Sequence, residues 1–179
     1  MSQTIAPVLL PPTRNIPTSS ARRRMNPTPE LVSMALLQAL RRAMHYLEFN
    51  LSRRPPGAYD SVQINGTKIA TRLDVGAEEV LKDAFWSFAG GSLAHVPLYG
   101  EESIGDALDL THFAGFVGLA DALDGTNNAF RIAENFATTA SIFDPAAPKG
   151  RKMIATGIVI PGGTAYLWDA TLDRVRGSM

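Results

Sequence analysis

The sequence predicts an α+β domain in which two N-terminal helices pack on a mixed, largely antiparallel sheet. Two amphipathic stretches come first, at residues 28–54 and 74–91, and short apolar runs separated by turn residues follow from residue 95 to residue 168. A run of helices followed by a run of strands is typical of an α+β domain, whereas regular alternation of strand and helix would indicate a parallel sheet.

Both helices have recognisable ends. The first is expected to begin after Thr28, which can cap it, with the Pro29 ring in its first turn and the Glu30 carboxylate near its positive end. Its apolar stripe consists of Leu37, Leu40, Met44, Leu47 and Leu51. The second helix has Asp74 near its start, and Gly90-Gly91 is expected to end it because glycine readily adopts the left-handed conformation.

The strands are expected from short apolar runs. The first is His95–Tyr99, which runs into the sequence Gly100-Glu101-Glu102-Ser103. Residues 113–120 are almost continuously apolar, as in a strand buried on both faces, and they end in Asp121. Three further strands are predicted, at residues 136–143, 153–160 and 164–168, and the turn Pro161-Gly162-Gly163 makes the last two a hairpin.

Composition excludes several kinds of partner. The 17 Lys and Arg residues balance 17 Asp and Glu residues, so we expect no binding of nucleic acid or of a membrane surface through net charge. Because the chain has no cysteine, any metal must be held by oxygen or histidine. Neither a membrane-spanning run nor a signal-peptide core is found, which predicts a cytoplasmic location.

The domain organisation follows from the first residues. Residues 1–27 contain five prolines, a serine pair and the triplet Arg22-Arg23-Arg24, with little periodicity, and we expect a disordered tail without an assigned function. Residues 28–179 are expected to form one domain that binds metal and phosphate.

Carboxylates follow two of the predicted strands. Asp121 and Asp124 come directly after a buried strand, where like charges repel strongly unless a cation lies between them. With Glu101-Glu102 and the backbone carbonyl of Leu123, they provide hard oxygen ligands for Mg²⁺, Ca²⁺ or Mn²⁺.

The next two residues are suited to a phosphate. Gly125 lets the backbone approach a ligand, Gly125-Thr126 can present backbone N–H groups to an anion, and the Thr126 hydroxyl can orient a water. Together with the aspartates, these features indicate metal-assisted hydrolysis of a phosphate ester.

Two simpler interpretations compete with this one. A calcium loop with Gly125 in its sixth position would begin at Ala120 and end at Arg131, which does not fit the EF-hand pattern. By spacing alone, Asp121 and Asp124 could equally be turn-capping residues, and this alternative stays open.

The motifs resemble the paired signature of the inositol monophosphatase superfamily, the Mg²⁺-dependent, lithium-sensitive phosphatases of sugar, inositol and nucleotide phosphates. The resemblance rests on Gly100-Glu101-Glu102-Ser103 and on residues 121–126, Asp-Ala-Leu-Asp-Gly-Thr, with Thr71-Arg72-Leu73-Asp74 as a third segment. It extends from about Thr28 to Trp168 and covers the N-terminal portion of a family member. It implies a layered α/β/α/β/α sugar-phosphatase-like fold whose C-terminal layers are missing from this chain.

The resemblance also implies residue roles. Glu101, Asp121, Asp124 and the carbonyl of Leu123 would bind two or three Mg²⁺ ions, and Glu101 would also help to activate water.

Thr126, held by Asp74, would hydrogen-bond the nucleophilic water, and the amides of Gly125 and Thr126 would bind the substrate phosphate. The resemblance thus implies Glu101, Thr126 and Asp74 as the catalytic residues.

Three features depart from the family pattern. Ala122 stands where the family usually has proline, and the residues after Thr126, Asn127-Asn128, do not identify a subfamily. The family's C-terminal Trp-Asp motif is not found at its expected distance. Trp168-Asp169-Ala170 has a similar spelling, but it comes too soon after Asp124, and we interpret it as a coincidence.

The expected function is therefore Mg²⁺-dependent hydrolysis of a small phosphorylated metabolite such as an inositol, sugar or nucleotide phosphate. The alternative is a truncated metal- and phosphate-binding remnant with weak or no catalysis, so whether the chain is an enzyme stays open. A missing sheet partner would expose apolar surface and strand edges, which predicts a marginal, aggregation-prone or homodimeric chain.

Overall fold

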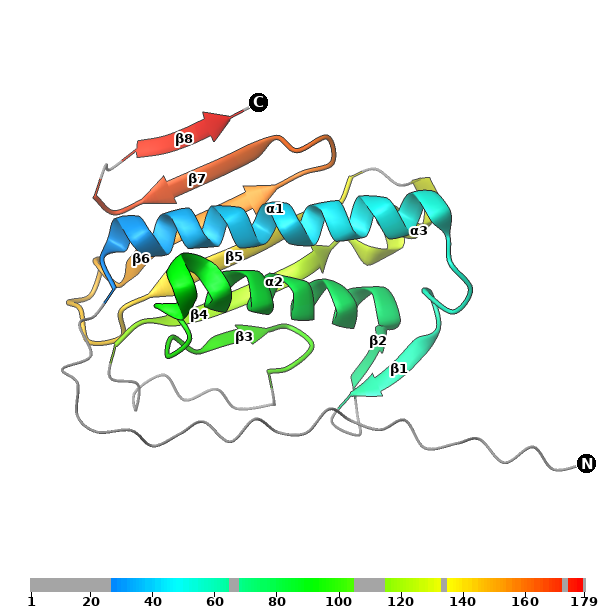
Figure 1. Cartoon of the computed structure of the whole chain (residues 1–179), viewed down its shortest axis with the longest axis horizontal. Helices are drawn as coiled ribbons and strands as arrows, with labels where there is room; N and C mark the ends of the chain where they lie inside the picture. Colours follow the sequence, from blue (N-terminus) through cyan, green and yellow to red (C-terminus); the bar gives the residue numbers. More distant parts are fainter. Residues whose placement is uncertain (1–26, 65–67, 105–114, 133–134, 172–173, 179) are drawn as a thin grey trace, which may run out of the picture.

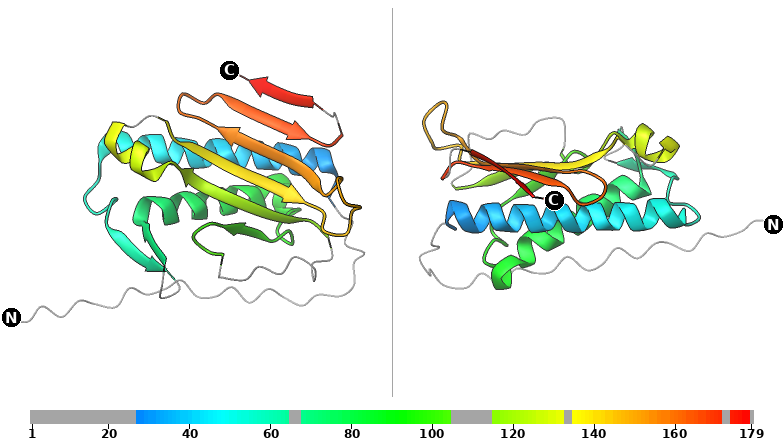
Figure 2. Two further views of the ribbon diagram at one scale, coloured as in Figure 1. Left: turned by 180° about the vertical axis from the view of Figure 1, so that it is seen from behind. Right: turned by 90° about the horizontal axis from the view of Figure 1, so that it is seen from above.

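The computed structural model describes residues 27–64, 68–104, 115–132, 135–171 and 174–178 of the chain, so the predicted tail lies outside the described residues except for Pro27. Two long helices, α1 (Pro29–Arg53) and α2 (Arg72–Gly91), lie side by side on one face of a mixed sheet (Figures 1 and 2). This arrangement confirms the predicted α+β fold.

Over the described residues, the main sheet has six strands in the order β3-β4-β5-β6-β7-β8. Their bounds are Leu98–Gly100, Val117–Asp124, Ala137–Phe143, Met153–Val159, Ala165–Asp169 and Arg174–Ser178. The pair β3–β4 is parallel, and each later pair is antiparallel. A separate hairpin of β1 (Ser61–Ile64) and β2 (Lys68–Thr71) leads into α2, and the short helix α3 (Thr126–Ile132) follows β4.

Helix α1 forms much of the core. The Thr28 hydroxyl accepts a hydrogen bond from the Leu31 amide at 3.3 Å, which is the N-cap expected from the sequence. Of the predicted apolar stripe, all but Leu37 are buried, and Leu37 is partly buried. Leu40 packs on the backbone of β6, where a Cβ on Gly157 would lie 2.7 Å from its methyl group. The helix is therefore held closely against the middle of the sheet.

Helix α2 begins with a capping box. The Thr71 hydroxyl accepts a hydrogen bond from the Asp74 amide, and the Asp74 carboxylate accepts one from the Thr71 amide. The regular helix ends where Phe88 takes a ψ of 141° and Gly90 a φ of 70°. The predicted end at Gly90-Gly91 is thus confirmed. Within the described part of the chain, neither of the long helices nor α3 is apolar and long enough to cross a membrane.

Two predicted strands are displaced in the structure. The strand expected at residues 113–120 is β4 at Val117–Asp124, so Asp121 and Asp124 lie within the strand and not after it. Pairing with β5 extends β4, and such cross-strand pairing is invisible to a local apolar pattern. The strand expected at His95–Tyr99 is β3 at Leu98–Gly100, and it begins after Pro97, which has no amide to donate.

Candidate active site

Parallel pairing of β3 with β4 brings two acidic residues to the same edge of the sheet. Leu98 pairs with Gly118 and Gly100 with Ala120, and the Glu101 amide donates to the Ala120 carbonyl at 2.8 Å. The residues that follow the last pair are Glu101 and Asp121. Because parallel strands end at the same side of a sheet, these two carboxylates meet there.

The carboxylate of Asp121 is strongly perturbed by this neighbour. Burial, the charge of Glu101, a hydrogen bond between the two side chains and the charge of Asp124 raise its pKa to about 7, although the Leu123 amide opposes the shift. Two carboxylates can share a hydrogen bond only if one carries a proton. Below about pH 7 the metal-free pair would therefore share a proton, in a place where a cation could instead neutralise the charge.

A β-bulge sets the direction of Asp124. Between Asp121 and Asp124 the strand advances three residues while β5 advances two, from Thr139 to Ala137. Residues three apart on a regular strand point to opposite faces, and the extra residue restores the same side. The intervening Ala122 and Leu123 are both buried, as expected if the bulge turns both of them toward the core.

The acidic residues fit Mg²⁺ only in part. Asp124 is exposed and acts on Asp121 through its charge. Among the described residues, no three His, Cys, Asp or Glu side chains gather closely enough to form a ready metal site. The paired Glu101 and Asp121 nevertheless offer oxygen ligands only, which suit a hard divalent cation, and a cation there would take over the role of the shared proton. The site therefore fits Mg²⁺ in the type of its donor atoms, although the donors are not gathered into a ready cluster.

Thr126 and Asp74 come together from elements far apart in the sequence. The Thr126 hydroxyl lies 3.0 Å from Asp74 Oδ1 and 3.1 Å from the Leu123 carbonyl oxygen, and it can donate to either. The other Asp74 oxygen accepts from the Thr71 amide at 2.7 Å and from the Thr71 hydroxyl. Asp74 is only 6% exposed. Its carboxylate is held by three donors, the amide and hydroxyl of Thr71 and the hydroxyl of Thr126. The expected pairing of Asp74 with Thr126 is present.

Gly125 has a structural reason to be glycine. Its φ is +87°, and a Cβ there would lie 2.9 Å from the Asn135 carbonyl oxygen and 3.3 Å from the α-carbon of Phe136. The Gly125 carbonyl accepts from the Asn128 amide at 2.8 Å, which starts α3. Close packing at the start of α3 therefore explains this glycine, and its role toward phosphate stays a prediction.

Asp169 lies away from these residues. It pairs with Ala155, Ala155 pairs with Ile142, and Ile142 pairs with Gly118, so Asp169 is level with the start of β4. Its carboxylate accepts hydrogen bonds from the amide and hydroxyl of Thr171, as in a turn. The register thus separates Trp168-Asp169 from the acidic end of β4.

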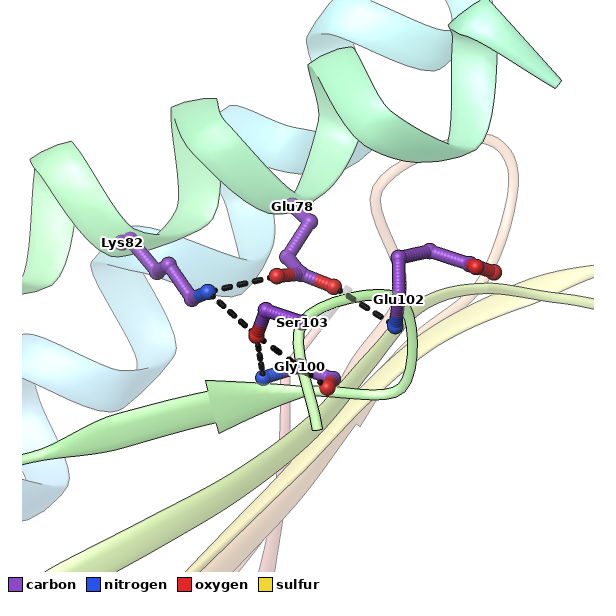
Figure 3. Close-up of polar contacts among 5 residues, drawn as sticks. All are labelled: Glu78, Lys82, Gly100, Glu102 and Ser103. Atoms are coloured by element: carbon purple, nitrogen blue, oxygen red, sulfur yellow. Dashed lines mark hydrogen bonds and ion pairs between the residues drawn. The ribbon is translucent and has the colours of Figure 1, made fainter. Parts of the chain in front are cut away.

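A polar network beside Glu101 was not predicted from the sequence. Glu78 and Lys82 on α2 point at the turn that follows β3, where they meet Glu102 and Ser103 (Figure 3). Their spacing of four residues on a helix is a detectable ion-pair signal, but the contact with a turn more than twenty residues away is not local.

Several solved structures resemble this fold. No protein-family model matches the sequence, and no curated protein matches it. The chain is similar to the extragenic suppressor protein suhB from Bartonella henselae, with a TM-score of 0.59, 14% identity, and coverage of 82% of this chain and 51% of that one. For the Thermotoga maritima IMPase the TM-score is 0.54 at 15% identity, with coverage of 79% and 49%.

A third similar structure is SaIMPase-II with bound inositol monophosphate, with a TM-score of 0.56, 17% identity, and coverage of 83% of this chain and 45% of that chain. At such identities the likeness concerns the fold. The chain therefore has the fold of the inositol monophosphatases, as the sequence motifs suggested, and it spans about half the length of the solved structures that it matches.

Proposed function

We propose that this chain carries the metal- and phosphate-binding part of a Mg²⁺-dependent phosphomonoesterase. The observation that carries the proposal is that the parallel pairing of β3 with β4 brings Glu101 beside Asp121. A carboxylate whose pKa is raised to about 7 by burial and by a neighbouring carboxylate is a candidate for ligand binding. The structural likeness to inositol monophosphatases supports the same class of reaction.

The donor set gives each residue a role. Glu101, Asp121, Asp124 and the Leu123 carbonyl would hold the Mg²⁺ ions. When bound, Mg²⁺ lowers the pKa of a water and neutralises charge on a phosphate ester. Binding there would displace the proton that Glu101 and Asp121 share, so affinity should rise with pH through the titration of Asp121.

Thr126 is suited to orient a water. Its single proton goes to Asp74 or to the Leu123 carbonyl, which leaves oxygen lone pairs that can accept a hydrogen bond from a water. Asp74 is itself fixed by Thr71, so the hydroxyl has little freedom to rotate. The amides of Gly125 and Thr126 are the proposed contacts to the substrate phosphate.

The substrate class follows from the similar structures and not from the site. SaIMPase-II has been solved with inositol monophosphate and with 2'AMP, so a small phosphorylated metabolite of the inositol, sugar or nucleotide kind is the proposed substrate. The described residues show no feature that selects among these.

A second candidate is a protein that binds metal and phosphate without turnover. Two observations favour it: the chain spans about half of the similar structures, and no group of three acidic side chains is gathered in the described residues. Two-metal hydrolysis needs both ions held firmly, which four oxygen donors alone would do weakly.

The test is phosphate release by the whole 179-residue chain from a panel of inositol, fructose and adenosine monophosphates in millimolar Mg²⁺. The proposal expects release that EDTA stops, that Asp121→Asn abolishes and that Asp83→Asn leaves unchanged, since Asp83 is exposed on α2. Mg²⁺ binding without release would favour the second candidate. Release that neither EDTA nor Asp121→Asn affects would overturn the metal site.

A further inference from the structure

The turn after β3 is fixed at every amide. The Gly100 amide donates to the Ser103 hydroxyl at 3.0 Å, and the Glu101 amide to the Ala120 carbonyl at 2.8 Å. The Glu102 amide donates to Glu78 Oε2 at 2.9 Å, and the Ser103 and Ile104 amides both donate to the Gly100 carbonyl. Of these five hydrogen bonds, two are accepted by side-chain oxygens, on Ser103 and Glu78.

One ammonium group joins those two acceptors. Lys82 Nζ bonds Glu78 Oε1 and donates to the Ser103 hydroxyl at 2.7 Å, as Figure 3 shows. Lys82 therefore bridges the helix α2 and the turn. It contacts Glu78 and Ser103, the two side chains that accept hydrogen bonds from amides of the turn.

The pair is more than a surface salt bridge. The Glu78 side chain is 7% exposed and that of Lys82 is 16% exposed, so both charges are largely removed from water. Breaking a buried pair by removing one partner leaves an uncompensated charge, which is far more costly than losing an exposed pair. The Glu78 carboxylate also lies close against the backbone of the turn, because a Cβ on Gly100 would lie 1.9 Å from its carboxyl carbon.

We propose that Lys82 and Glu78 are positioning residues that set the Glu101 carboxylate beside Asp121. This inference rests on the proposed function, since it concerns how the metal-binding pair is held. Lys82 holds the Glu78 carboxylate in the orientation that accepts from the Glu102 amide, and the position of that amide fixes the backbone of its neighbour Glu101. Without the ammonium, the largely buried Glu78 carboxylate would lose its partner close to an acidic turn, and its rotation toward water would release the Glu102 amide.

The variants separate charge from hydrogen bonding. Lys82→Met removes the charge and keeps the aliphatic chain, and Lys82→Arg restores a cation. Glu78→Gln combined with Lys82→Met removes both charges while an amide oxygen can still accept from the Glu102 amide. Lys149→Met is the matched control, because Lys149 is exposed in the loop between β5 and β6.

The first measurement is amide hydrogen exchange at Glu101 and Glu102 in the metal-free protein, followed by NMR. Amide exchange reports local opening of the backbone, so it detects a loosened turn even if the protein has no catalytic activity. We expect Lys82→Met to raise exchange at both amides, and we expect Lys82→Arg and the double variant to stay near the wild-type rate. Unchanged exchange in Lys82→Met would overturn the positioning role.

The second measurement is Mg²⁺ affinity by calorimetry. For Lys82→Met we expect about tenfold weaker binding, the lower end of the range for groups that orient metal ligands, with recovery in Lys82→Arg and no change in Lys149→Met. Equal affinity of Lys82→Met and wild type would overturn the inference while leaving the proposed function intact. Absence of Mg²⁺ binding by the wild type would instead remove the proposed function, and the exchange data would then decide the positioning role alone.

Discussion

Two aspartates on one sheet have opposite surroundings. Asp169 in β7 is 6% exposed, and its carboxylate accepts hydrogen bonds from the Thr171 amide at 2.9 Å and from the Thr171 hydroxyl. Asp121 in β4 faces another carboxylate, and its pKa is raised to about 7. The first has local donors that satisfy it, whereas the second has a like charge that destabilises its ionised form.

The difference shows how position decides function for one residue type. Trp168-Asp169 matches the Trp-Asp letters of the family's C-terminal motif. The antiparallel register, however, places Asp169 level with Gly118, at the start of β4. Asp121 lies at the other end, where parallel pairing with β3 delivers Glu101. A carboxylate held against a like charge is a candidate for ligand binding, whereas the charge of Asp169 is satisfied by donors within its own turn.

The largest expected effect is on Mg²⁺ affinity, which should depend on Asp121 and not on Asp169. Asp121→Asn should weaken Mg²⁺ binding by more than about 100-fold, beyond the range for residues that only orient ligands, because the amide cannot balance the cation's charge. Asp169→Ala should leave that affinity unchanged. Its effect should instead be on the free energy of unfolding, which should fall by about 1 to 2 kcal/mol as Thr171 loses its acceptor.

Calorimetric titration with Mg²⁺ and urea unfolding of both variants measure these outcomes. In metal-free buffer at pH 8, Asp121→Asn should be at least as stable as the wild type, because it removes repulsion with Glu101. Loss of Mg²⁺ affinity in Asp169→Ala, with the fold retained, would contradict the structural role of Asp169 and connect it to the site at Asp121.

A second prediction concerns the hydroxyl that Asp74 holds. Thr126→Val keeps the shape and removes the hydroxyl that would orient the water, so the rate of Mg²⁺-dependent phosphate release should fall about 100-fold, as expected when a reactant loses its positioning. Thr126→Ser retains a hydroxyl within reach of Asp74 Oδ1 and should keep most of the rate. Comparison of kcat and KM for the two variants checks this, and equal kcat values would remove the role of the hydroxyl.

A third prediction tests the packing of α2 on the acidic turn. Gly100→Ala places a Cβ 1.9 Å from the Glu78 carboxyl carbon, and overpacking of this kind costs about 1 to 3 kcal/mol of stability. Glu78 cannot yield without losing its bonds to Lys82 and the Glu102 amide. In a Glu78→Ala background the same substitution should cost much less, as urea unfolding of the four proteins would reveal. An equal cost in both backgrounds would place the strain elsewhere.

Local signals predicted the helices and the identity of the acidic residues. The cap at Thr28, the stripe of α1 and the end of α2 depend on residues within a few positions of one another, so the sequence is sufficient for them. The juxtaposition of Glu101 with Asp121 also followed from strand ends.

Non-local contacts were not predictable in the same way. The bulge before Asp124 and the position of β4 depend on pairing with β5, and β8 was missed because it has no clear apolar alternation. The bridge from Lys82 to Ser103 depends on how α2 lies against the turn. Register and packing decide each of these, and neither can be read from a single segment.

The last expected effect is a pH dependence of stability that belongs to Asp121 and not to Asp169. In the metal-free folded chain the pKa of Asp121 is about 7, against 3.8 as its ordinary value. Between these two values the folded state binds more protons than the unfolded state, so this residue makes stability fall as pH rises from about 4 to about 7. Below that window the contribution is fully present, and above it the contribution is lost.

Thermal unfolding in EDTA across this pH range measures the trend. The wild type should lose stability relative to Asp121→Asn as pH rises, since the neutral amide does not titrate, and the Asp169→Ala profile should run parallel to that of the wild type. Saturating Mg²⁺ should reverse the trend, because the cation favours the ionised carboxylates and stabilises the folded state by mass action. Parallel profiles for wild type and Asp121→Asn in EDTA would show that Glu101 and Asp121 do not share a proton in solution.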